Sequence, residues 1–393
     1  MNPYKELIDT DIQGKNILLR EDLNVPSKNS EIVNDERIRA AIPTINYILS
    51  KNAKVSIISH FGRPYEGKFD EKYSLRIVAE RMAKILNRSV HFEEIPLDQK
   101  SPEYTNDITV HENTRFLVGE KSGDEDLARK IAKNCDVFVM DAFGASHRKH
   151  CSTYTLSKFA PVTCGGLLII EEIKNLKKIF ENPKKPMIAV IGGSKVSTKL
   201  TVLKELLNKV DVIIVGGGIA NTFLKSSGFE IGQSLFEESM INKANEIIKI
   251  ANKKKVSLPL PDDVVCENKI STSIKEIIKI ENEDIIKDIG PKTSRKYEKL
   301  FEEAGTILWN GPVGVFEKKP FENGTKDIAS AICKSNAFTI AGGGDTISAL
   351  EKFANISSIN YVSTGGGAFL QNLASVPTAF ASITNRLFAN EYV

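Results

Sequence analysis

The sequence predicts an α/β protein in which a sheet of parallel strands is covered by helices on both faces. Short apolar runs alternate with longer amphipathic stretches, and in the second half the apolar runs end in glycine-containing turns. Most of these turns precede a stretch whose apolar residues have helical spacing. A repeated order of strand, glycine turn and helix is typical of a doubly wound, Rossmann-like sheet. The 393 residues suggest two or three domains of roughly 150 residues each.

The expected elements follow this order in both halves. In the first half we expect strands at 16–20, 54–59 and 136–141 and helices at 35–50 and 74–86. In the second half we expect strands at 187–191, 210–215, 306–309, 337–341 and 360–364. The glycines after these strands would lie at the carboxyl edge of the sheet. Because ligands bind at that edge in open α/β sheets, we place a nucleotide site there.

Composition and charge exclude several classes of protein. Hydrophobic residues make up 41% and charged residues 26%, with a net charge of +3, as in ordinary globular chains. The chain has no concentrated basic run of the kind that nucleic-acid binders carry, and no apolar stretch of the roughly 20 residues that span a bilayer. Its five cysteines are scattered without a CxxC pair, which favours reduced thiols, and the polar N-terminus has no apolar signal core. We expect a cytoplasmic protein without nucleic-acid or membrane partners.

Several cationic side chains of the first half follow apolar runs, where the end of a strand would place them at the sheet edge. Guanidinium groups pair bidentately with carboxylate and phosphate oxygens, so several from separate loops could hold a small ligand with more than one negative group. A lone arginine is more often a solvated surface residue, and this alternative stays open for each one. The candidates are Arg20, Arg37, Arg39, His60, Arg63, Arg115, His147, Arg148 and His150.

The histidines allow a different interpretation. His147 and His150 have the spacing of two metal ligands on one helical face. No constellation of carboxylates or cysteines accompanies them, however. A phosphohistidine intermediate has no support from the sequence either.

The sharpest local signal of the second half is the string Gly-Gly-Ser-Lys-Val-Ser-Thr-Lys at 192–199. It follows an expected strand and should open a helix, so that Lys195 and Lys199 share one helical face near phosphate oxygens. The string is not a Walker A loop, because the GxxxxGK[ST] spacing is absent. A solvated lysine pair is the alternative.

Two further strings carry candidate ligands. Gly-Gly-Gly-Asp-Thr at 342–346 places Asp345 at a turn from strand to helix. This aspartate could hold Mg²⁺ together with phosphate oxygens, or it could cap the helix. In Trp-Asn-Gly-Pro-Val-Gly-Val-Phe-Glu at 309–317, Trp309 is expected in the core. Glu317 could accept hydrogen bonds from a ribose diol or be an ordinary surface residue.

Taken together, these strings resemble the phosphoglycerate kinase family across nearly the whole chain. So many strings in the same order make the resemblance specific. The matching strings are REDLNVP (20–26), DERIRAAIPTI (35–45), SHFGRP (59–64), ENTRF (112–116), DAFGASHRKHCST (141–153), GGSKVSTK (192–199), GGGIANTF (216–223), DIGPKT (288–293), WNGPVGVFE (309–317), GGGDT (342–346) and STGGGA (363–368).

The resemblance implies roles for the residues at matching positions. The phosphoglycerate would be bound by Asp22, Asn24, Arg37, His60, Phe61, Gly62, Arg63, Arg115 and Arg148. ADP or ATP would be bound by Lys199, Glu317, Gly343, Gly344, Asp345 and Thr346, with phosphate contacts from Gly365 and Gly366. Arg37, Lys195 and Lys199 would act on the transferring phosphoryl group. Asp345 would ligate Mg²⁺.

The resemblance also implies an organisation and a reaction. Two doubly wound domains would face each other across a cleft, joined by a hinge helix. The phosphoglycerate domain would cover 1–170, with the tail 376–393 packed back on it, and the nucleotide domain 171–375. The residues themselves favour a connecting helix near 165–180, before the prolines of 183–186. The family acts as a monomer and transfers a phosphoryl group directly from 1,3-bisphosphoglycerate to ADP, with domain closure.

Some positions depart from the family pattern. Phe61 stands where the family often has leucine, and residues 144–148 read GASHR instead of GTAHR. After GGGA, residues 369–371 read FLQ where the family usually has SLE, and residues 373–375 read LAS instead of LEG. We expect the changes in the last helix to affect phosphate affinity or the behaviour of the hinge.

Two alternatives come from other functional classes. A non-catalytic anion-binding or sensor protein could use the same fold. It would have no need of the clamp formed by Lys195, Lys199 and Asp345, however. A dinucleotide-dependent dehydrogenase would carry GxGxxG after an early strand and an acidic residue about 20 positions later, which the glycine runs here do not match. We therefore expect a kinase.

Overall fold

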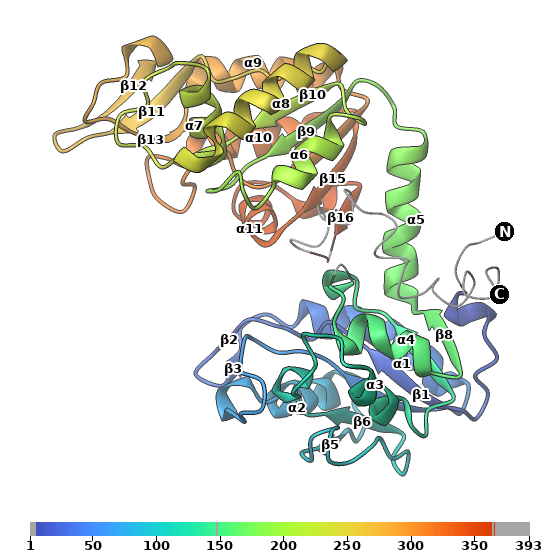
Figure 1. Cartoon of the computed structure of the whole chain (residues 1–393). Coiled ribbons are helices and arrows are strands. Elements are labelled where there is room, and N and C mark those ends of the chain that lie inside the picture. Colours follow the sequence, from blue (N-terminus) through green and yellow to red (C-terminus); the bar gives the residue numbers. More distant parts are fainter. Residues whose placement is uncertain (1–4, 147, 364, 366–393) are drawn as a thin grey trace. The chain divides into compact units, whose positions relative to one another are not determined.

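The computed structural model describes residues 5–146, 148–363 and 365. The chain divides into two compact units between Lys174 and Asn175. We call the described residues up to Lys174 unit 1 and the described residues from Asn175 onward unit 2 (Figure 1). Helix α5 (Leu167–Glu181) contains this division.

Unit 1 is built on a six-stranded parallel sheet with the order β5-β6-β4-β1-β7-β8. Its strands are β1 (Asn16–Arg20), β4 (Lys54–Ile58), β5 (His91–Glu93), β6 (Ile108–His111), β7 (Val137–Met140) and β8 (Val162–Gly165). The helices are α1 (Glu36–Ser50), α2 (Arg76–Leu86), α3 (Glu125–Ala132) and α4 (Leu156–Phe159), and a small hairpin of β2 (Ser27–Lys28) and β3 (Glu31–Ile32) precedes α1. Four consecutive residues of central strand β1 are buried, as expected for a parallel strand covered on both faces.

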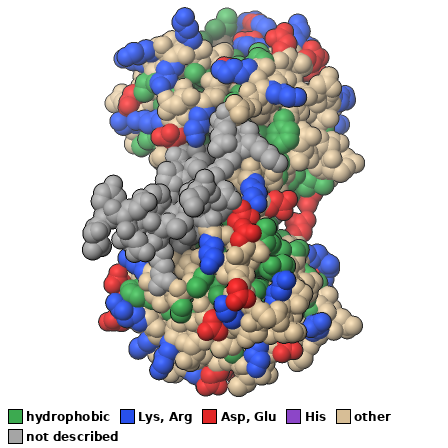
Figure 2. Space-filling model, turned by 90° about the vertical axis from the view of Figure 1, so that its right-hand side faces the viewer, with side chains coloured by type: hydrophobic (Ala, Val, Ile, Leu, Met, Phe, Trp, Pro, Cys, Tyr) green, Lys and Arg blue, Asp and Glu red, His purple; other side chains and the backbone are tan. Residues whose placement is uncertain are grey.

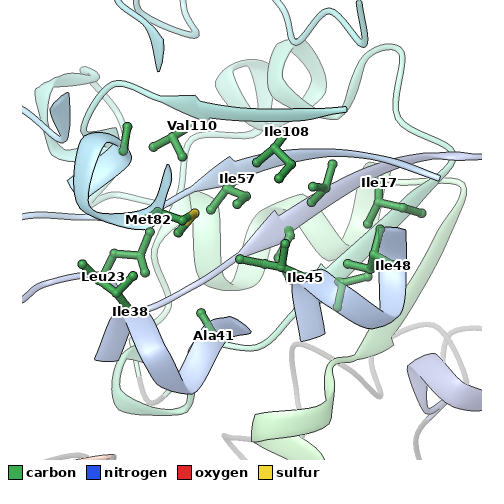
Figure 3. Close-up of a cluster of buried hydrophobic side chains, with 14 of the residues drawn as sticks. Ile17, Leu23, Ile38, Ala41, Ile45, Ile48, Ile57, Met82, Ile108 and Val110 are labelled. Carbon is green, nitrogen blue, oxygen red and sulfur yellow. The ribbon is translucent and has the colours of Figure 1, made fainter. Parts of the chain in front are cut away.

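Helix α1 packs on the sheet because its apolar residues repeat at three- and four-residue spacing. Ile38, Ala41, Ile45 and Ile48 lie on one face of the helix and are fully buried. Figure 3 shows this face beside side chains of β1, β4 and β6, with Met82 of α2 in the same cluster. Each fully buried isoleucine stabilises the fold by about 1.5–3 kcal/mol relative to an exposed one. The position of α1, and of Arg37 in its first turn, is therefore fixed by packing.

A buried carboxyl pair lies where β1 and β7 end, and one member anchors the first turn of α5. Asp141 Oδ1 accepts a hydrogen bond from the Ile169 amide at 2.8 Å, and Oδ2 accepts one from the Thr44 hydroxyl at 2.5 Å. Glu21 is hydrogen-bonded to the same carboxyl group and is 1% exposed. Burial raises the pKa of both carboxyl groups, and Asp141 raises that of Glu21 further. Asp141 thus ties the sheet to α5.

Unit 2 is built on a five-stranded parallel sheet with the order β10-β9-β14-β15-β16. Its strands are β9 (Met187–Ile191), β10 (Val212–Val215), β14 (Thr306–Asn310), β15 (Phe338–Gly342) and β16 (Tyr361–Ser363). Its helices, besides the end of α5, are α6 (Leu200–Leu206), α7 (Gly217–Ser226), α8 (Ile241–Lys254), α9 (Pro291–Glu303), α10 (Asn323–Lys334) and α11 (Gly344–Phe353). A separate antiparallel sheet contains β11 (Asp263–Glu267), β12 (Thr272–Glu276) and β13 (Ile285–Ile289) in the order β12-β11-β13. Trp309 is fully buried in the core, as expected, with Tyr297 and Phe301 of α9.

The predicted fold class is confirmed, since both units contain a parallel sheet with alternating strands and helices. Every strand and helix that was predicted with bounds is present, and the described ends lie within two residues of the prediction. The antiparallel sheet was missed because β12 (TSIKE) and β13 (IIKDI) mix charged and apolar residues and lack the short apolar run that predicted the other strands. The tail 376–393 lies outside the described residues. The boundary expected after residue 170 falls within α5, as does the observed division. The domain roles, the cleft and the hinge closure stay predictions.

The surface carries charges of both signs. Lysine and arginine side chains alternate with acidic ones over the face drawn in Figure 2, in keeping with the net charge of +3. Within the described ranges, no helix combines the length and apolarity that crossing a membrane requires. All five cysteines are free thiols, as predicted, and all except Cys333 are buried.

The variant Thr44→Val tests the Asp141 anchor. Valine keeps the shape of threonine but removes the hydroxyl donor to a buried carboxyl group, so we expect a loss of about 1–3 kcal/mol in stability. The Ile169 amide should exchange with solvent faster, which hydrogen-exchange mass spectrometry would measure. Thr272→Val, at an exposed position of β12, is the matched control, with an expected effect below about 0.5 kcal/mol. Equal exchange of α5 in the two variants would contradict the anchor.

Candidate active site

Four loops of unit 1 leave the sheet at one edge, because the strands that they follow, β6, β4, β1 and β7, are parallel neighbours. These loops carry the residues predicted to bind the anionic substrate. Asp22 and Asn24 follow β1, residues 60–63 follow β4, Arg115 follows β6 and Arg148 follows β7. Arg37 joins them from the first turn of α1.

Backbone contacts hold three of these loops together at Gly62. Asn24 Oδ1 accepts a hydrogen bond from the Gly62 amide at 2.8 Å, and Arg115 Nη1 donates one to the Gly62 carbonyl at 3.1 Å. Gly62 has a φ of 60°, and a Cβ at this position would lie 2.2 Å from Cδ1 of Tyr73. A side chain is excluded here by both conformation and space. Gly62 therefore serves the site through its backbone.

Asn113 is a part of this site that the sequence analysis missed. Its Oδ1 accepts hydrogen bonds from the amides of Phe61 and Arg115, each at 3.0 Å. Its Nδ2 donates to the carbonyls of Phe61 at 2.7 Å and of Tyr73 at 2.9 Å. The side chain of Phe61 itself packs in the hydrophobic core of unit 1. The available signal was the position of Asn113 inside ENTRF, two residues after β6.

The charged groups of unit 1 lie close enough to affect one another. Arg37 Nη1 pairs with Asp22 Oδ2 at 2.8 Å, and His60 Nδ1 lies 3.9 Å from Asp22 Oδ1. Burial lowers the pKa of His60 well below its ordinary value, and nearby guanidinium groups lower it further. In order of effect, these belong to Arg20, Arg115, Arg148 and Arg37.

The lowered pKa values of Arg115 and Arg148 show that burial and neighbouring cations disfavour the charge of these guanidinium groups. Burial, followed by the charge of Arg148, lowers the pKa of Arg115. Burial also lowers the pKa of Arg148, with Arg63 adding to the effect and Asp22 opposing it. Arg115 is 7% exposed, and its Nε has no hydrogen-bond partner among the described residues. Buried polar groups without partners and neighbouring like charges both cost free energy, which an anion bound among them would recover.

The metal interpretation of the histidines gains no support. His147 lies outside the described residues, and the two residues before His150 are not helical; a π-helical turn at Cys151–Thr155 follows it. Over the part of the chain that the structure describes, no group of three or more His, Cys, Asp or Glu side chains is arranged to hold a metal ion.

In unit 2, the ends of β9, β14 and β15 meet around Lys199. Its ammonium group donates to the carbonyls of Gly192 at 2.8 Å and Asn310 at 3.2 Å, and also to Asn310 Oδ1. Asn310 Nδ2 in turn donates to the carbonyl of Gly342. Burial lowers the pKa of Lys199 to about 8, and Asp345 opposes this effect. The sequence analysis gave no role to Asn310, which orients the ammonium group.

The expectation that Lys195 and Lys199 share one helical face is wrong. Helix α6 begins at Leu200, with Lys199 as its N-cap, and residues 192–198 form loop and turns. Serine and threonine hydroxyls compete for backbone groups and favour turns over helix. Accordingly, the Thr198 hydroxyl donates to the carbonyl of Lys195 at 2.8 Å. Lys195 is exposed.

Asp345 lies in the first turn of α11 with an exposed side chain. Gly343 precedes the helix with a φ of 104°, which glycine adopts readily, and a Cβ on Gly344 would meet nothing within 4 Å. The hydroxyl of Thr346 accepts a hydrogen bond from the Gly311 amide at 2.6 Å, so it joins the β14 loop to α11. An exposed carboxylate beside open space suits Mg²⁺, which takes one or two carboxylates and completes its shell with water and phosphate oxygens.

A cavity of about 370 Å³ lies in unit 2 beside these loops. Its lining includes Glu317 and Asp345 and is apolar over most of its area. The other lining residues include Gly193, Gly217, Gly218, Leu224, Leu235, Val264, Ile289, Val313 and Gly314. A largely apolar cavity with a few polar groups suits a heterocyclic ligand that has a polar end.

The predicted phosphate-contact glycines are described only in part. Gly365 is buried, and its amide donates to the hydroxyl of Ser363 at 3.1 Å. Gly366 lies outside the described residues. Phosphate contacts of these two glycines stay a prediction.

Comparison with known proteins identifies the family. The family model for phosphoglycerate kinase matches residues 7–375. The chain belongs to the phosphoglycerate kinase family. Its function is accordingly that of a kinase of this family, and the alternatives of a non-catalytic binding protein and of a dehydrogenase are set aside.

Named relatives and solved structures agree with this assignment. The kinase is 49% identical over 379 residues to phosphoglycerate kinase of Legionella pneumophila (strain Lens), covering 95% of each chain. It is 48% identical over 377 residues to the Francisella philomiragia subsp. philomiragia enzyme, covering 94% of this chain and 95% of the relative. The structure of phosphoglycerate kinase from Coxiella burnetii matches with a TM-score of 0.88 at 44% identity, covering 98% of this chain and 100% of that one. The enzyme from Pyrococcus horikoshii OT3 matches with a TM-score of 0.82 at 29% identity, covering 98% and 99%.

Asp288 is a buried carboxyl group in the cavity wall of the kinase that the sequence analysis did not single out. Its oxygens accept hydrogen bonds from the amides of Ile289 at 2.9 Å and Gly324 at 2.6 Å. A Cβ on Gly314 would lie 2.1 Å from Asp288 Oδ1. Burial raises the pKa of Asp288 to about 7, although these hydrogen bonds oppose the change. Asp288 lies inside DIGPKT, but the string does not tell a buried acid from an exposed one.

The stability of unit 2 should depend on pH through Asp288. Because its folded pKa is raised, the folded form holds the proton more tightly, and this stabilisation is complete below about pH 4 and lost as the pH rises through about 7. Asp288→Asn should remove this decline, at the cost of one acceptor oxygen. Urea unfolding at several pH values would measure it, with Trp309, the single tryptophan, as the fluorescent probe. An unchanged pH slope in the variant would contradict the assignment.

Proposed function

We propose that this kinase transfers a phosphoryl group reversibly from 1,3-bisphosphoglycerate to ADP, giving 3-phosphoglycerate and ATP. The observation that carries the proposal is the group of guanidiniums after neighbouring strands of unit 1, in a chain that belongs to the kinase family. In the direction that consumes ATP, the acceptor is the carboxyl group of 3-phosphoglycerate. The activity is then that of an ATP:3-phospho-D-glycerate 1-phosphotransferase.

Unit 1 binds the phosphoglycerate in this proposal. Guanidinium groups form bidentate pairs with phosphate and carboxylate oxygens, and the crowding around Arg115 and Arg148 favours a bound anion. Asn24 and Gly62 align the loops, while Phe61 contributes through its backbone because its side chain is 3% exposed. The proposed ligand-binding residues are Asp22, Asn24, Arg37, His60, Phe61, Gly62, Arg63, Arg115 and Arg148.

Unit 2 binds ADP or ATP in this proposal. The largely apolar cavity would take the base, and Glu317 in its lining would accept hydrogen bonds from the ribose. Lys195 and Lys199 would bind the phosphate oxygens, with contacts from Gly343, Gly344 and Thr346 and, further along the chain, from Gly365 and Gly366. Lys199 is already oriented by Asn310, so little reorganisation would be needed when the phosphates arrive.

Asp345 would hold Mg²⁺ together with phosphate oxygens of the nucleotide. When bound, the ion would neutralise part of the negative charge on those phosphates. The chain contributes an exposed carboxylate and the open space beside Gly344. We further propose that the enzyme works as a monomer in the cytoplasm.

The chemistry requires no general base. A carboxylic acid of ordinary pKa is ionised at neutral pH, so the nucleophile of the ATP-consuming direction is present without activation. Phosphoryl transfer then depends on alignment and on neutralising the charge of the moving group. Arg37, Lys195 and Lys199 supply positive charge for this purpose.

Arg37→Ala tests the role of the first cation. We expect the rate to fall by about 10²–10³, as for the loss of one well-placed donor to developing charge. Arg39→Ala is the matched control, because Arg39 lies on the same helix but pairs with a different carboxylate. Its Nε lies 2.8 Å from Asp35, whereas Arg37 pairs with Asp22. Steady-state kinetics with circular dichroism as a check on folding would measure both. Near-normal turnover of Arg37→Ala would contradict its role.

The lysines and the metal ligand are tested in the same assay, which follows formation of ADP from ATP that depends on 3-phosphoglycerate. Lys195→Ala should lower the rate by about 10²–10³, with Lys204→Ala, which loses only an ion pair with Glu246, as its control.

Asp345→Asn should raise the Mg²⁺ concentration needed for half-maximal rate several-fold. Asp327→Asn, exposed on α10, should not. Activity that is independent of Mg²⁺ would contradict the role of Asp345.

A further inference from the structure

We propose that Arg20, held by Ser152 and Glu120, is a positioning residue that keeps His60 a neutral hydrogen-bond donor with its hydrogen on Nε2. The inference rests on the proposed function, in which His60 binds the phosphoglycerate. It concerns three residues to which the proposed function gives no role. None of the three would touch the ligand.

These residues form a continuous chain of buried polar contacts. Arg20 Nη2 lies 3.3 Å from His60 Nδ1, and Arg20 Nε donates to the Ser152 hydroxyl at 3.0 Å. Ser152 Oγ donates to Glu120 Oε1 at 2.5 Å, and the Ser152 amide donates to Oε2 at 3.0 Å. The remaining Nη1 of Arg20 donates to the carbonyl of Glu21. Glu120 and Ser152 are fully buried, Arg20 is 1% exposed and His60 is 4% exposed.

The chemistry of Glu120 and Arg20 fixes the direction of the hydrogen bonds that link Glu120, through Ser152 and Arg20, to His60. Glu120 as a carboxylate can only accept, so the single hydrogen of the Ser152 hydroxyl is directed toward it. Arg20 can only donate, so the Ser152 oxygen and the Nδ1 atom of His60 must accept. A neutral imidazole has one ring hydrogen, which then lies on Nε2. His60 is therefore left with one donor atom for a ligand, and that atom is Nε2.

The charges that face His60 keep the ring neutral. Its pKa is lowered well below the ordinary value, first by burial and then by guanidinium groups. The facing groups are Arg20 at the end of β1, Arg37 on α1, Arg115 after β6, Arg148 after β7 and the carboxylate of Asp22, 3.9 Å from Nδ1. Glu120 compensates the charge of Arg20, since each shifts the pKa of the other toward the charged form.

A neutral donor has two advantages at this position. A protonated imidazole would add one more cation to a group of guanidiniums that already repel one another. An ordinary histidine also changes its charge near pH 6.5, so its contribution to anion binding would vary within the physiological range. Because Nδ1 accepts a hydrogen bond from Arg20, His60 offers its Nε2 hydrogen to a ligand. Its ring stays neutral across the physiological pH range.

Nitrogen NMR of the full chain labelled with ¹⁵N-histidine tests the proposal directly. We expect His60 Nδ1 to show the chemical shift of an unprotonated acceptor and Nε2 that of a protonated nitrogen, unchanged between about pH 5.5 and 8, on either side of the ordinary titration. The variant His60→Gln identifies the His60 signals among those of the five histidines. A hydrogen on Nδ1, or a ring that titrates near its ordinary pKa, would overturn the proposal.

A charge-balanced double variant, Arg20→Met with Glu120→Gln, tests the role of Arg20. It removes the cation and the carboxylate together, so no buried charge is left unpaired. His60 should then titrate at a higher pH than in the wild type, because its nearest cation is gone while Asp22 remains. The KM for 3-phosphoglycerate should rise by about tenfold with a much smaller change in kcat. Glu120→Gln alone keeps Arg20 and is the matched control, with His60 still neutral. A wild-type titration in the double variant would overturn the role of Arg20.

The positioning role of Arg20 and the proposed function of the enzyme can fail separately. The NMR measurement needs no substrate, so a wrong tautomer overturns the positioning role even in a fully active enzyme. A chain with the expected tautomer but without turnover of 3-phosphoglycerate would support the positioning of His60 and contradict the proposed function.

Discussion

The repulsion among the guanidinium groups at the carboxyl edge of the unit 1 sheet is the constraint on which the phosphoglycerate site depends. Burial and neighbouring cations lower the pKa values of Arg20, Arg115 and Arg148, which means that folding disfavours their charge. The structure offsets this cost with fixed acceptors: Arg115 donates to the carbonyl of Gly62, and Arg20 donates to the hydroxyl of Ser152, which in turn donates to the carboxylate of Glu120. Because these acceptors belong to loops anchored on neighbouring parallel strands, the cations keep their places without a ligand. A site whose dipoles and charges are already oriented needs little reorganisation when an anion binds.

In unit 2, the corresponding constraint is the close approach of the loops that follow β9 and β14. A Cβ on Gly192 would lie 1.9 Å from the carbonyl oxygen of Pro312, so only glycine lets the loop after β9 touch the loop after β14. The carbonyls of Gly192 and Asn310, brought together in this way, both accept hydrogen bonds from Lys199. The first glycine of the GGSK string is therefore explained by contact between backbones and not by contact with phosphate. Lys199 is positioned as a consequence of that contact.

The sequence was sufficient for the parallel sheets and for most residue types of the site, because apolar periodicity and the positions of strand ends are local properties. It was insufficient wherever a side chain acts through a partner far along the chain. Asn113 bonds to Phe61, 52 residues away, and Lys199 bonds to Asn310, 111 residues away. The error about the two lysines has the opposite origin. There the hydroxyl of Thr198 bonds locally to the carbonyl of Lys195 and favours a turn, and the four-residue spacing of the lysines was given too much weight. Phe61 shows a third limit, since a residue inside a ligand-binding string can have its side chain in the core.

Burial separates the structural aspartates of this kinase from the one proposed to bind metal. Asp141, Asp263 and Asp288 lie at or near strand ends, are at most 5% exposed, and accept amide hydrogens near the first turns of α5, α9 and α10. Those amides have no partner within their own helices, so a buried carboxylate satisfies them and also complements the helix dipole. Asp345 occupies the first turn of α11 as well, but its side chain is exposed. A carboxylate that is not consumed by helix amides keeps its oxygens for a ligand. An aspartate near the first turn of a helix therefore has two uses, and the hydrogen bonds that it already makes decide between them.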